Sequence, residues 1–174
     1  PSLQIVLLAG APDTKEIGEE MTARVAEVSA NRDGVIWVPE MLPRPDVIQF
    51  YSNAAVFCCP SVYEPFGIIN LEALACETAV VASAIGGIPE VVVPGETGEL
   101  VPLELKEGTF DPVDPLAFSH ALAAAINTVA LDPDLRARYG QAGRQRVEGH
   151  FSWSAIADRT LELYRRVLGL RAEG

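Results

Sequence analysis

The sequence predicts an α/β protein whose parallel β-sheet is covered by helices on both faces. Short apolar runs alternate with amphipathic helical segments along the 174 residues, which is the pattern of repeated βα units. The run Ala-Val-Val-Ala-Ser at 79–83 is continuously apolar up to its last residue, as a parallel strand buried on both faces should be. Glycine turns at Gly67 and at Gly86-Gly87 each follow such a run and open a helix. Ligands of these sheets bind at that edge, where the strands end.

The first third of the chain is predicted to alternate between strands and helices. Leu3 to Leu8 is apolar enough for a buried strand, and the residues at 9–13 then make a turn. Thr14 to Ser29 has apolar residues at helical spacing. The next elements expected are a strand at 35–38, a loop at 39–45, a helix that Asp46 caps and that runs to about Tyr51, and a strand at 55–59.

The rest of the chain continues the alternation and ends in helices. A helix from about Ile69 to Cys76 precedes the strand at 79–83, and Gly86-Gly87 opens a short second helix. The elements predicted after it are a strand at 99–101, a polar excursion at 103–113, and helices that begin at Pro115, Pro133 and Ser152, the second of them running to about Gly143. The arginines at 136, 138, 144 and 146 are predicted to lie on a solvated helix face.

Composition and charge exclude several classes of function. The net charge of −11 argues against nucleic acid as a partner. Apolar residues make up 49% of the chain, yet the sequence has no run of the ~18 that a membrane span needs. Cys58, Cys59 and Cys76 fit reduced packing residues of a cytoplasmic protein. The two histidines and three cysteines have no metal-ligand spacing, so no metal site is expected.

The segment from Ser61 to Ala73 carries the strongest indication of chemistry. Pro65 restricts the backbone of the turn, and Gly67 lets the backbone approach a ligand closely. The first amides of the following helix, near Ile68 to Leu71, are expected to have no intrahelical partner and therefore to attract an anion such as phosphate. Glu64 and Glu72 stand eight residues apart and can bind hydroxyls. A nucleotide-sugar, with a diphosphate between two hydroxyl-rich groups, fits this arrangement.

The sequence lacks a cation near this predicted phosphate site. No Lys or Arg occurs between Arg44 and Lys106, although a bound diphosphate usually has a cationic clamp. The clamp must come from Arg44, from elsewhere in the fold, or from protein outside this chain, and we expect the last of these.

The same motifs resemble a known family. The residues that carry the resemblance are 61–73, 78–90 and the turn Gly95-Glu96-Thr97-Gly98. They are similar to the carboxyl-terminal, donor-binding domain of retaining nucleotide-sugar glycosyltransferases of the GT-B type, whose Glu-x7-Glu element is matched here by Glu64 and Glu72. Within that group, 60–72 and the insertion at 103–112 before Asp114-Pro115 resemble actinobacterial glycogen synthases.

The resemblance implies roles for individual residues. Glu64, the catalytic candidate, would contact hydroxyls of the donor sugar. The amides of Phe66, Gly67 and Ile68 would line the sugar and phosphate, those of Asn70 and Leu71 would face the diphosphate, and Glu72 would hold the ribose. Met41 and Leu42 would border the base. Gly86 and Gly87 could contact substrate or only form a turn.

The resemblance also implies a fold and an activity. The fold is the Rossmann-like, doubly wound carboxyl-terminal half of GT-B, here lacking its first βα unit, which carries the Arg and Lys of the diphosphate clamp. Residues 1–174 would be one truncated donor-binding domain, inactive alone, and the acceptor domain would lie outside this chain. The reaction would transfer glucose from ADP-glucose or UDP-glucose to an α-1,4-glucan, without a metal or other cofactor.

Three alternatives stay open at this point. The acceptor could be another one, giving sucrose, trehalose, a lipid-linked sugar or a cell-wall glycan. The chain could also be a nucleotide-binding module without catalysis. A glycosidase pair of carboxylates is disfavoured, because Glu64 and Glu72 come from one strand–helix junction.

Overall fold

The computed structural model describes residues 3–8, 10, 12 and 14–169. The chain divides into two compact units, residues 1–47 and 48–174. The turn predicted at 9–13 lies partly outside the described residues, since Ala9, Ala11 and Asp13 are not among them.

The first unit is a βαβ element. Strands β1 (Ile5–Leu8) and β2 (Val35–Val38) pair in parallel, and helix α1 (Lys15–Asn31) connects them. Thr14 caps α1, because its hydroxyl oxygen accepts a hydrogen bond from the Ile17 amide at 3.3 Å. The prediction that the first strand is buried is wrong: Ile5 and Leu8 are 39% and 41% exposed. Within the described residues β1 pairs only with β2, and a two-stranded sheet cannot cover both of its faces.

Helix α2 (Arg44–Asn53) follows β2 and contains the boundary between the units. It begins two residues before the predicted Asp46, so Asp46 lies in its first turn instead of capping it. A carboxylate in the first turn still favours the helix through the helix dipole.

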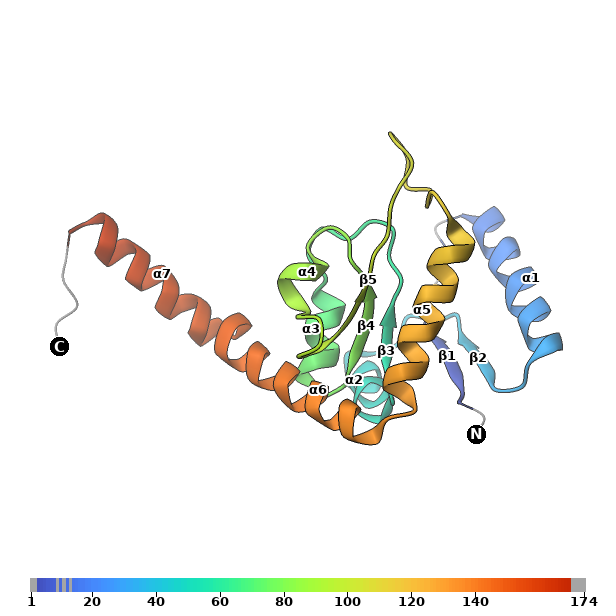
Figure 1. Ribbon diagram of the computed structural model, residues 1–174, viewed down its shortest axis with the longest axis horizontal. Helices are drawn as coiled ribbons and strands as arrows, with labels where there is room; N and C mark the ends of the chain where they lie inside the picture. The colour runs from blue at the N-terminus through green and yellow to red at the C-terminus, as the bar shows by residue number, and fades with distance from the viewer. Residues whose placement is uncertain (1–2, 9, 11, 13, 170–174) are drawn as a thin grey trace. The chain divides into compact units, whose positions relative to one another are not determined.

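The second unit contains a three-stranded parallel sheet in the order β3 (Phe57–Cys59), β4 (Val80–Ser83), β5 (Gly98–Val101). Figure 1 shows helix α5 (Pro115–Ala130) against one face of this sheet, and α3 (Ile68–Ala75) and α4 (Ile88–Val91) against the other. Central strand β4 is buried throughout. Its Val81 packs with Val101, Val129 and Tyr139 in a core on the α5 side, and alternate β4 side chains point to the opposite face.

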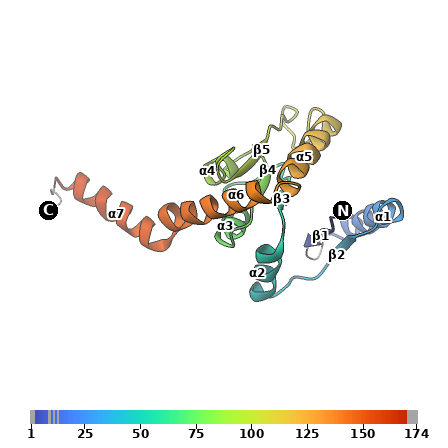
Figure 2. The same cartoon turned by 60° about the horizontal axis from the view of Figure 1, so that its bottom comes forward.

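The helix predicted to run from Pro133 to about Gly143 extends further than predicted. Helix α6 (Pro133–Arg146) continues into a π-helical turn, η1 (Val147–Phe151), and Ser152 then caps α7 (Trp153–Val167) as expected, its hydroxyl oxygen accepting from the Ala155 amide at 3.2 Å. Figure 2 shows the path from α6 through η1 into α7. None of the α7 side chains is buried within the described residues.

The predicted parallel α/β class is confirmed, although the described strands form two separate sheets.

The thiols of Cys58, Cys59 and Cys76 are free, as predicted. Burial raises the pKa of the Cys58 thiol to about 11, with the neighbouring Cys59 as a smaller cause, so Cys58 stays protonated near neutral pH. Among the described residues, no helix is both long and apolar enough to cross a bilayer.

Candidate functional site

The turn between β3 and α3 is held by the neighbouring strand. Ser83, fully buried at the end of β4, donates its hydroxyl to the Ser61 carbonyl at 2.5 Å. Further along the turn, Gly67 adopts φ 98° and precedes the first residue of α3. A side chain at residue 67 would be strained, because this left-handed conformation suits glycine. Gly67 is therefore required where the sequence predicted a close backbone approach.

The Glu64 carboxylate lies at the amino-terminal end of α3. Its Oε1 accepts a hydrogen bond from the Gly67 amide at 3.0 Å and a longer one from the Phe66 amide at 3.5 Å. Two of the amides expected to line a ligand are thus already bound to the acidic side chain of the same motif. The position suits an anionic group, because the dipole of α3 is positive at this end.

The amides at the start of α3 that make hydrogen bonds are not the ones that the sequence predicted. Those of Asn70 and Leu71 donate to the Gly67 carbonyl, at 3.0 and 3.4 Å, and are engaged within the helix. The expectation that amides up to Leu71 lack intrahelical partners is therefore wrong, since the first-turn bonds begin at Asn70. Among the described residues, the amides of Ile68 and Ile69 make no hydrogen bond, and these side chains are 62% and 40% exposed.

Asn70 belongs to the interior under this turn. Its side chain is fully buried, and its Nδ2 contacts the Cys59 sulfur at 3.7 Å. A Cβ atom added at Gly67 would come within 2.9 Å of the same Nδ2. The Asn70 side chain thus packs directly against Gly67. Its Oδ1 has no hydrogen-bond partner among the described residues.

Glu72 lies one turn into α3 and is half-buried. The phenol of Tyr51, from α2, lies near this carboxylate, and Glu72 contributes to raising the Tyr51 pKa. Tyr51 is itself held by an edge-on contact with Phe57, whose ring centre is 5.2 Å away, and by the Thr78 hydroxyl, which donates to the Tyr51 carbonyl at 2.6 Å. A buried tyrosine that the sequence did not single out thus lies beside the second carboxylate of the motif.

Two buried tyrosines, Tyr51 and Tyr139, should make the free energy of unfolding depend on pH in the alkaline range. Burial, and to a lesser extent Glu72, raises the pKa of Tyr51 from 10.0 to about 12; burial and Glu99 raise the pKa of Tyr139 to about 12. The unfolded chain loses these protons first, so the free energy of unfolding should hold up to about pH 10 and fall between about pH 10 and 12. Each tyrosine contributes up to about 3 kcal/mol to that fall, at ~1.4 kcal/mol per pKa unit.

This dependence can be measured by urea unfolding across that pH range. Tyr51→Phe should remove about half of the decline, because Tyr139 keeps its own contribution. A decline of equal size in wild type and in the Tyr51→Phe, Tyr139→Phe double variant would contradict the assignment.

Gly86 and Gly87 pack directly on the Glu64 turn. The Gly87 amide donates to the Glu64 carbonyl at 3.0 Å. A Cβ atom at Gly86 would lie 1.9 Å from the Glu64 carbonyl oxygen, and one at Gly87 would lie 2.5 Å from the Phe66 Cα. Both glycines therefore have a packing role against the motif, while their contact with substrate stays a prediction.

The prediction that all four arginines of α6 lie on a solvated face is wrong for three of them, since Arg136, Arg144 and Arg146 bind backbone carbonyls. Arg136 donates to the Ala130 carbonyl. The Arg144 guanidinium donates to the Ala75 carbonyl at 2.6 Å, at the carboxyl end of α3. Arg146 donates to the Glu90 and Val91 carbonyls at 2.8 and 2.9 Å, at the end of α4. Both helices that start at the site thus end on an arginine of α6. Helical periodicity cannot identify the contacts of Arg144 and Arg146, because their partners are backbone atoms 55 to 69 residues away.

The polar excursion predicted at 103–113 folds back onto itself. Leu105 and Pro112 form an antiparallel bridge, and the Lys106 amide donates to the Asp111 carbonyl at 2.9 Å. Near its tip, the Phe110 ring lies 5.1 Å from that of Tyr63, the residue before Glu64. The excursion therefore contacts the turn that carries the first carboxylate.

Met41 and Leu42 lie in the first unit, in the loop between β2 and α2, and Met41 is 82% exposed. Their predicted place beside the base stays a prediction.

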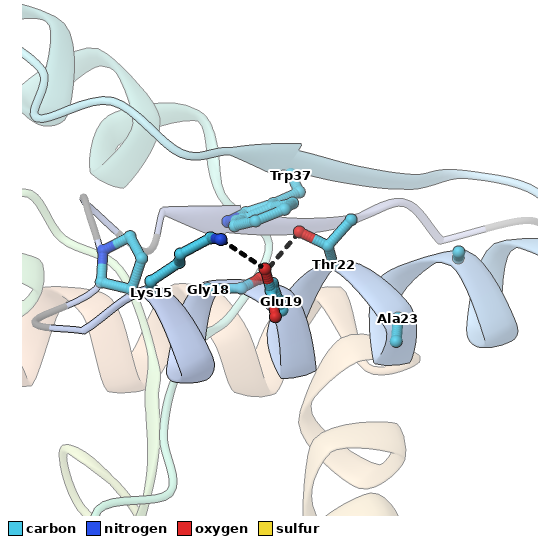
Figure 3. Close-up of a pocket in the computed structure, with 8 residues that line it drawn as sticks. Lys15, Gly18, Glu19, Thr22, Ala23 and Trp37 are labelled. Atoms are coloured by element: carbon cyan, nitrogen blue, oxygen red, sulfur yellow. Dashed lines mark hydrogen bonds and ion pairs between the residues drawn. The ribbon is translucent and has the colours of Figure 1, made fainter.

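The first unit also has an open depression of about 580 Å³, lined by eight residues from 12 to 37. Figure 3 shows Trp37 of β2 lying over Lys15 and Thr22 of α1, with the Lys15–Glu19 ion pair of 3.4 Å beside them. None of the predicted site residues lines this depression.

The described residues contain no cluster of three or more His, Cys, Asp or Glu side chains that could hold a metal ion. The expectation that the chain needs no metal is not tested by this observation and stays a prediction.

Comparison with known proteins places these features in context. A family model described as "Glycosyl transferases group 1" matches residues 5–109, more than half of the chain. Alpha-maltose-1-phosphate synthase of Mycolicibacterium smegmatis is 52% identical over 167 residues, which are 96% of this chain and 41% of that protein. Glycogen synthase of Mycobacterium tuberculosis is 38% identical over 114 residues, 65% of this chain and 24% of that protein.

A solved structure supports the fold. Sucrose-phosphate synthase from Thermosynechococcus elongatus superposes with a TM-score of 0.74 at 36% identity, and the match covers 95% of this chain and 39% of that one. The chain thus spans about two fifths of the length of the relatives that it matches over nearly its whole extent. Similarity to glycogen synthase is weaker and covers less of the chain than similarity to the maltose-1-phosphate synthase.

Proposed function

The chain belongs to the glycosyl transferases of group 1, and from this premise we propose that it is the nucleotide-sugar-binding part of a retaining glycosyltransferase. The observation that carries the proposal is the arrangement around α3. Glu64 binds the amides of Phe66 and Gly67, the amides of Ile68 and Ile69 follow without a hydrogen bond in the described residues, and Glu72 lies one turn further.

The proposed donor binds with its charged and hydroxyl groups on separate parts of this motif. The diphosphate lies against the amides of Ile68 and Ile69, at the positive end of the α3 dipole. The transferred sugar presents hydroxyls to Glu64, and the ribose hydroxyls bind Glu72. The donor is ADP-glucose or UDP-glucose. The complete protein supplies the cationic clamp and the acceptor domain from outside this chain, and the transfer needs no metal.

The acceptor that we favour is a sugar phosphate. By its name, the relative with 52% identity makes a maltose that carries a phosphate on C1. A glucosyl group joined to glucose 1-phosphate gives that product and releases the nucleoside diphosphate, so atoms balance. An α-1,4-glucan is the second candidate, favoured by the weaker match to glycogen synthase. Assays of the full-length protein with each acceptor distinguish the two.

Glu72→Ala should test the ribose contact. Loss of hydrogen bonds to a charged group costs roughly 1.5–3 kcal/mol, so the KM for the nucleotide-sugar should rise about 10- to 100-fold while the acceptor KM stays constant. Tyr51→Phe should raise the donor KM only a few-fold, because Glu72 keeps its charge and loses one polar neighbour.

Glu96→Ala is the matched control, since this exposed carboxylate lies in the turn before β5. A donor KM for Glu72→Ala that is no higher than that of Glu96→Ala would remove the ribose assignment. Steady-state kinetics of the full-length protein with varied donor measures all three variants.

A further inference from the structure

The end of α6 and the turn η1 contact both glycine turns of the candidate site. Arg146 donates from Nη2 to the Glu90 carbonyl at 2.8 Å and from Nε to the Val91 carbonyl at 2.9 Å. These carbonyls end α4, a helix of four residues. Carbonyls at the end of a helix have no partner within it, and a guanidinium both binds them and matches the negative end of the dipole. Such a short helix has little stability of its own, so α4 depends on this contact.

The same guanidinium contacts an aromatic side chain that leads to the Glu64 turn. The Arg146 guanidinium carbon lies 5.5 Å from the centre of the Phe151 ring, within the range of a cation–π interaction. Phe151 in turn meets Phe66 edge-on, with ring centres 6.1 Å apart and an interplanar angle of 61°. Phe66 directly precedes Gly67, whose amide binds the Glu64 carboxylate.

The π-helical turn is what brings Arg146 and Phe151 together. In an α-helix with 3.6 residues per turn, residues five apart point about 140° away from each other. In η1 the Ser152 amide bonds to the Val147 carbonyl at 2.9 Å, five residues back, which widens the turn and brings residues five apart closer to the same side than in an α-helix. A regular α-helix through 147–151 would direct Phe151 away from Arg146.

These contacts close a ring around the two glycine turns. From Phe66 they run through Phe151 and Arg146 to the end of α4. The residue before α4 is Gly87, which packs against Phe66 with a backbone approach that leaves no room for a Cβ atom. The Gly87 amide also bonds to the Glu64 carbonyl at 3.0 Å. Each turn is thus fixed against the other from two sides.

We propose that Arg146 and Phe151 are positioning residues of the nucleotide-sugar site, which they serve by holding the Phe66–Gly67 turn and α4 in a fixed relation. This role rests on the proposed function, since neither residue is assigned a contact with the donor. The two residues act by fixing the positions of the groups that bind the donor. A displacement of about 1 Å in such a group can lower the rate on the order of a hundredfold. Loss of this positioning role should therefore raise the KM for the donor and leave the KM for the acceptor unchanged.

The test compares full-length protein carrying Arg146→Met, Phe151→Leu or the control Arg138→Met, an exposed arginine of the same helix. Hydrogen exchange is followed in segments 64–70 and 86–92, with 120–128 of α5 as the internal reference. Arg146→Met and Phe151→Leu should each accelerate exchange in both turns at least about fivefold and leave the reference unchanged. The same variants should raise the donor KM about tenfold, ~1.4 kcal/mol, with the acceptor KM unchanged. Arg138→Met should match wild type in every readout.

Two results would overturn the positioning role: unchanged exchange in both turns, or equal acceleration of all three segments together with matching losses in donor and acceptor kinetics. If Arg146→Met does not fold, Arg146→Lys and Phe151→Leu decide the matter, because lysine keeps the charge and loses the paired donors. A wild-type protein that transfers no sugar would refute the proposed function, while the exchange comparison would still show whether the two turns depend on Arg146.

Discussion

Replacing Glu64 with alanine is expected to lower kcat/KM for the nucleotide-sugar about 10²- to 10³-fold in the full-length protein. The Glu64 carboxylate accepts from the Gly67 and Phe66 amides, and in the proposed complex it also binds sugar hydroxyls. Hydrogen bonds to a charged group contribute roughly 1.5–3 kcal/mol each, and every ~1.4 kcal/mol is a factor of ten. Loss of one or two such bonds, together with a less ordered Gly67 amide, gives the expected range.

Glu64→Gln provides the graded comparison. The amide retains an oxygen that can accept from Gly67 but loses the negative charge, so kcat/KM should fall about tenfold, the difference between a charged and a neutral hydrogen bond. Glu107→Ala, at an exposed position of the 103–113 excursion, should have no effect. Steady-state kinetics that place Glu64→Ala within threefold of wild type would show that this carboxylate has no part in the reaction.

Gly86→Ala is expected to have the largest effect on structure. Gly86 has φ +54°, and an added Cβ would lie 1.9 Å from the Glu64 carbonyl oxygen and 2.9 Å from its carbon. The left-handed conformation alone costs an alanine about 1–2 kcal/mol. The clash is with backbone that cannot rotate away, so the turn carrying Glu64 must move. We expect a loss of more than about 3 kcal/mol in the free energy of unfolding, a severe effect for one substitution, and no measurable transfer.

Gly95→Ala separates the cost of the left-handed backbone conformation from the cost of the clash with Glu64. Gly95 also has a positive φ, +74°, but no atom lies within 4 Å of its added Cβ. This variant should lose only the conformational part, about 1–2 kcal/mol, and keep its activity. Denaturant unfolding measures both variants, and equal losses for Gly86→Ala and Gly95→Ala would show that the contact with Glu64 has no energetic weight.

Much of the local structure could be predicted from the sequence, because it depends on short-range rules. The apolar run of β4, the proline and glycine around Glu64 and the cap at Ser152 each act over a few residues. The strand–turn–helix that carries Glu64 and Glu72 was therefore predictable to within two residues at each end. The left-handed conformation of Gly67 is a finding of the structure, since the sequence predicted only a close backbone approach there.

The contacts that position this motif could not be predicted, because they join residues far apart in sequence. Tyr51 reaches Glu72 from another helix, and Arg146 bonds to carbonyls 55 and 56 residues away. The π-turn at 147–151 has no simple sequence signature, and the helix expected to stop at Gly143 continues through it. The use of the Glu64 carboxylate as a partner for its own turn also depends on side-chain geometry that periodicity does not contain.

In the proposed complex, the amides at the start of α3 hold the diphosphate and Glu72 holds the ribose. The most direct measurement is a crystal structure of the full-length protein with a bound nucleoside diphosphate. Phosphate oxygens within hydrogen-bond distance of the Ile68 and Ile69 amides, with the ribose hydroxyls on the Glu72 carboxylate, are the predicted result. A diphosphate bound elsewhere, with those amides facing only solvent, would contradict it.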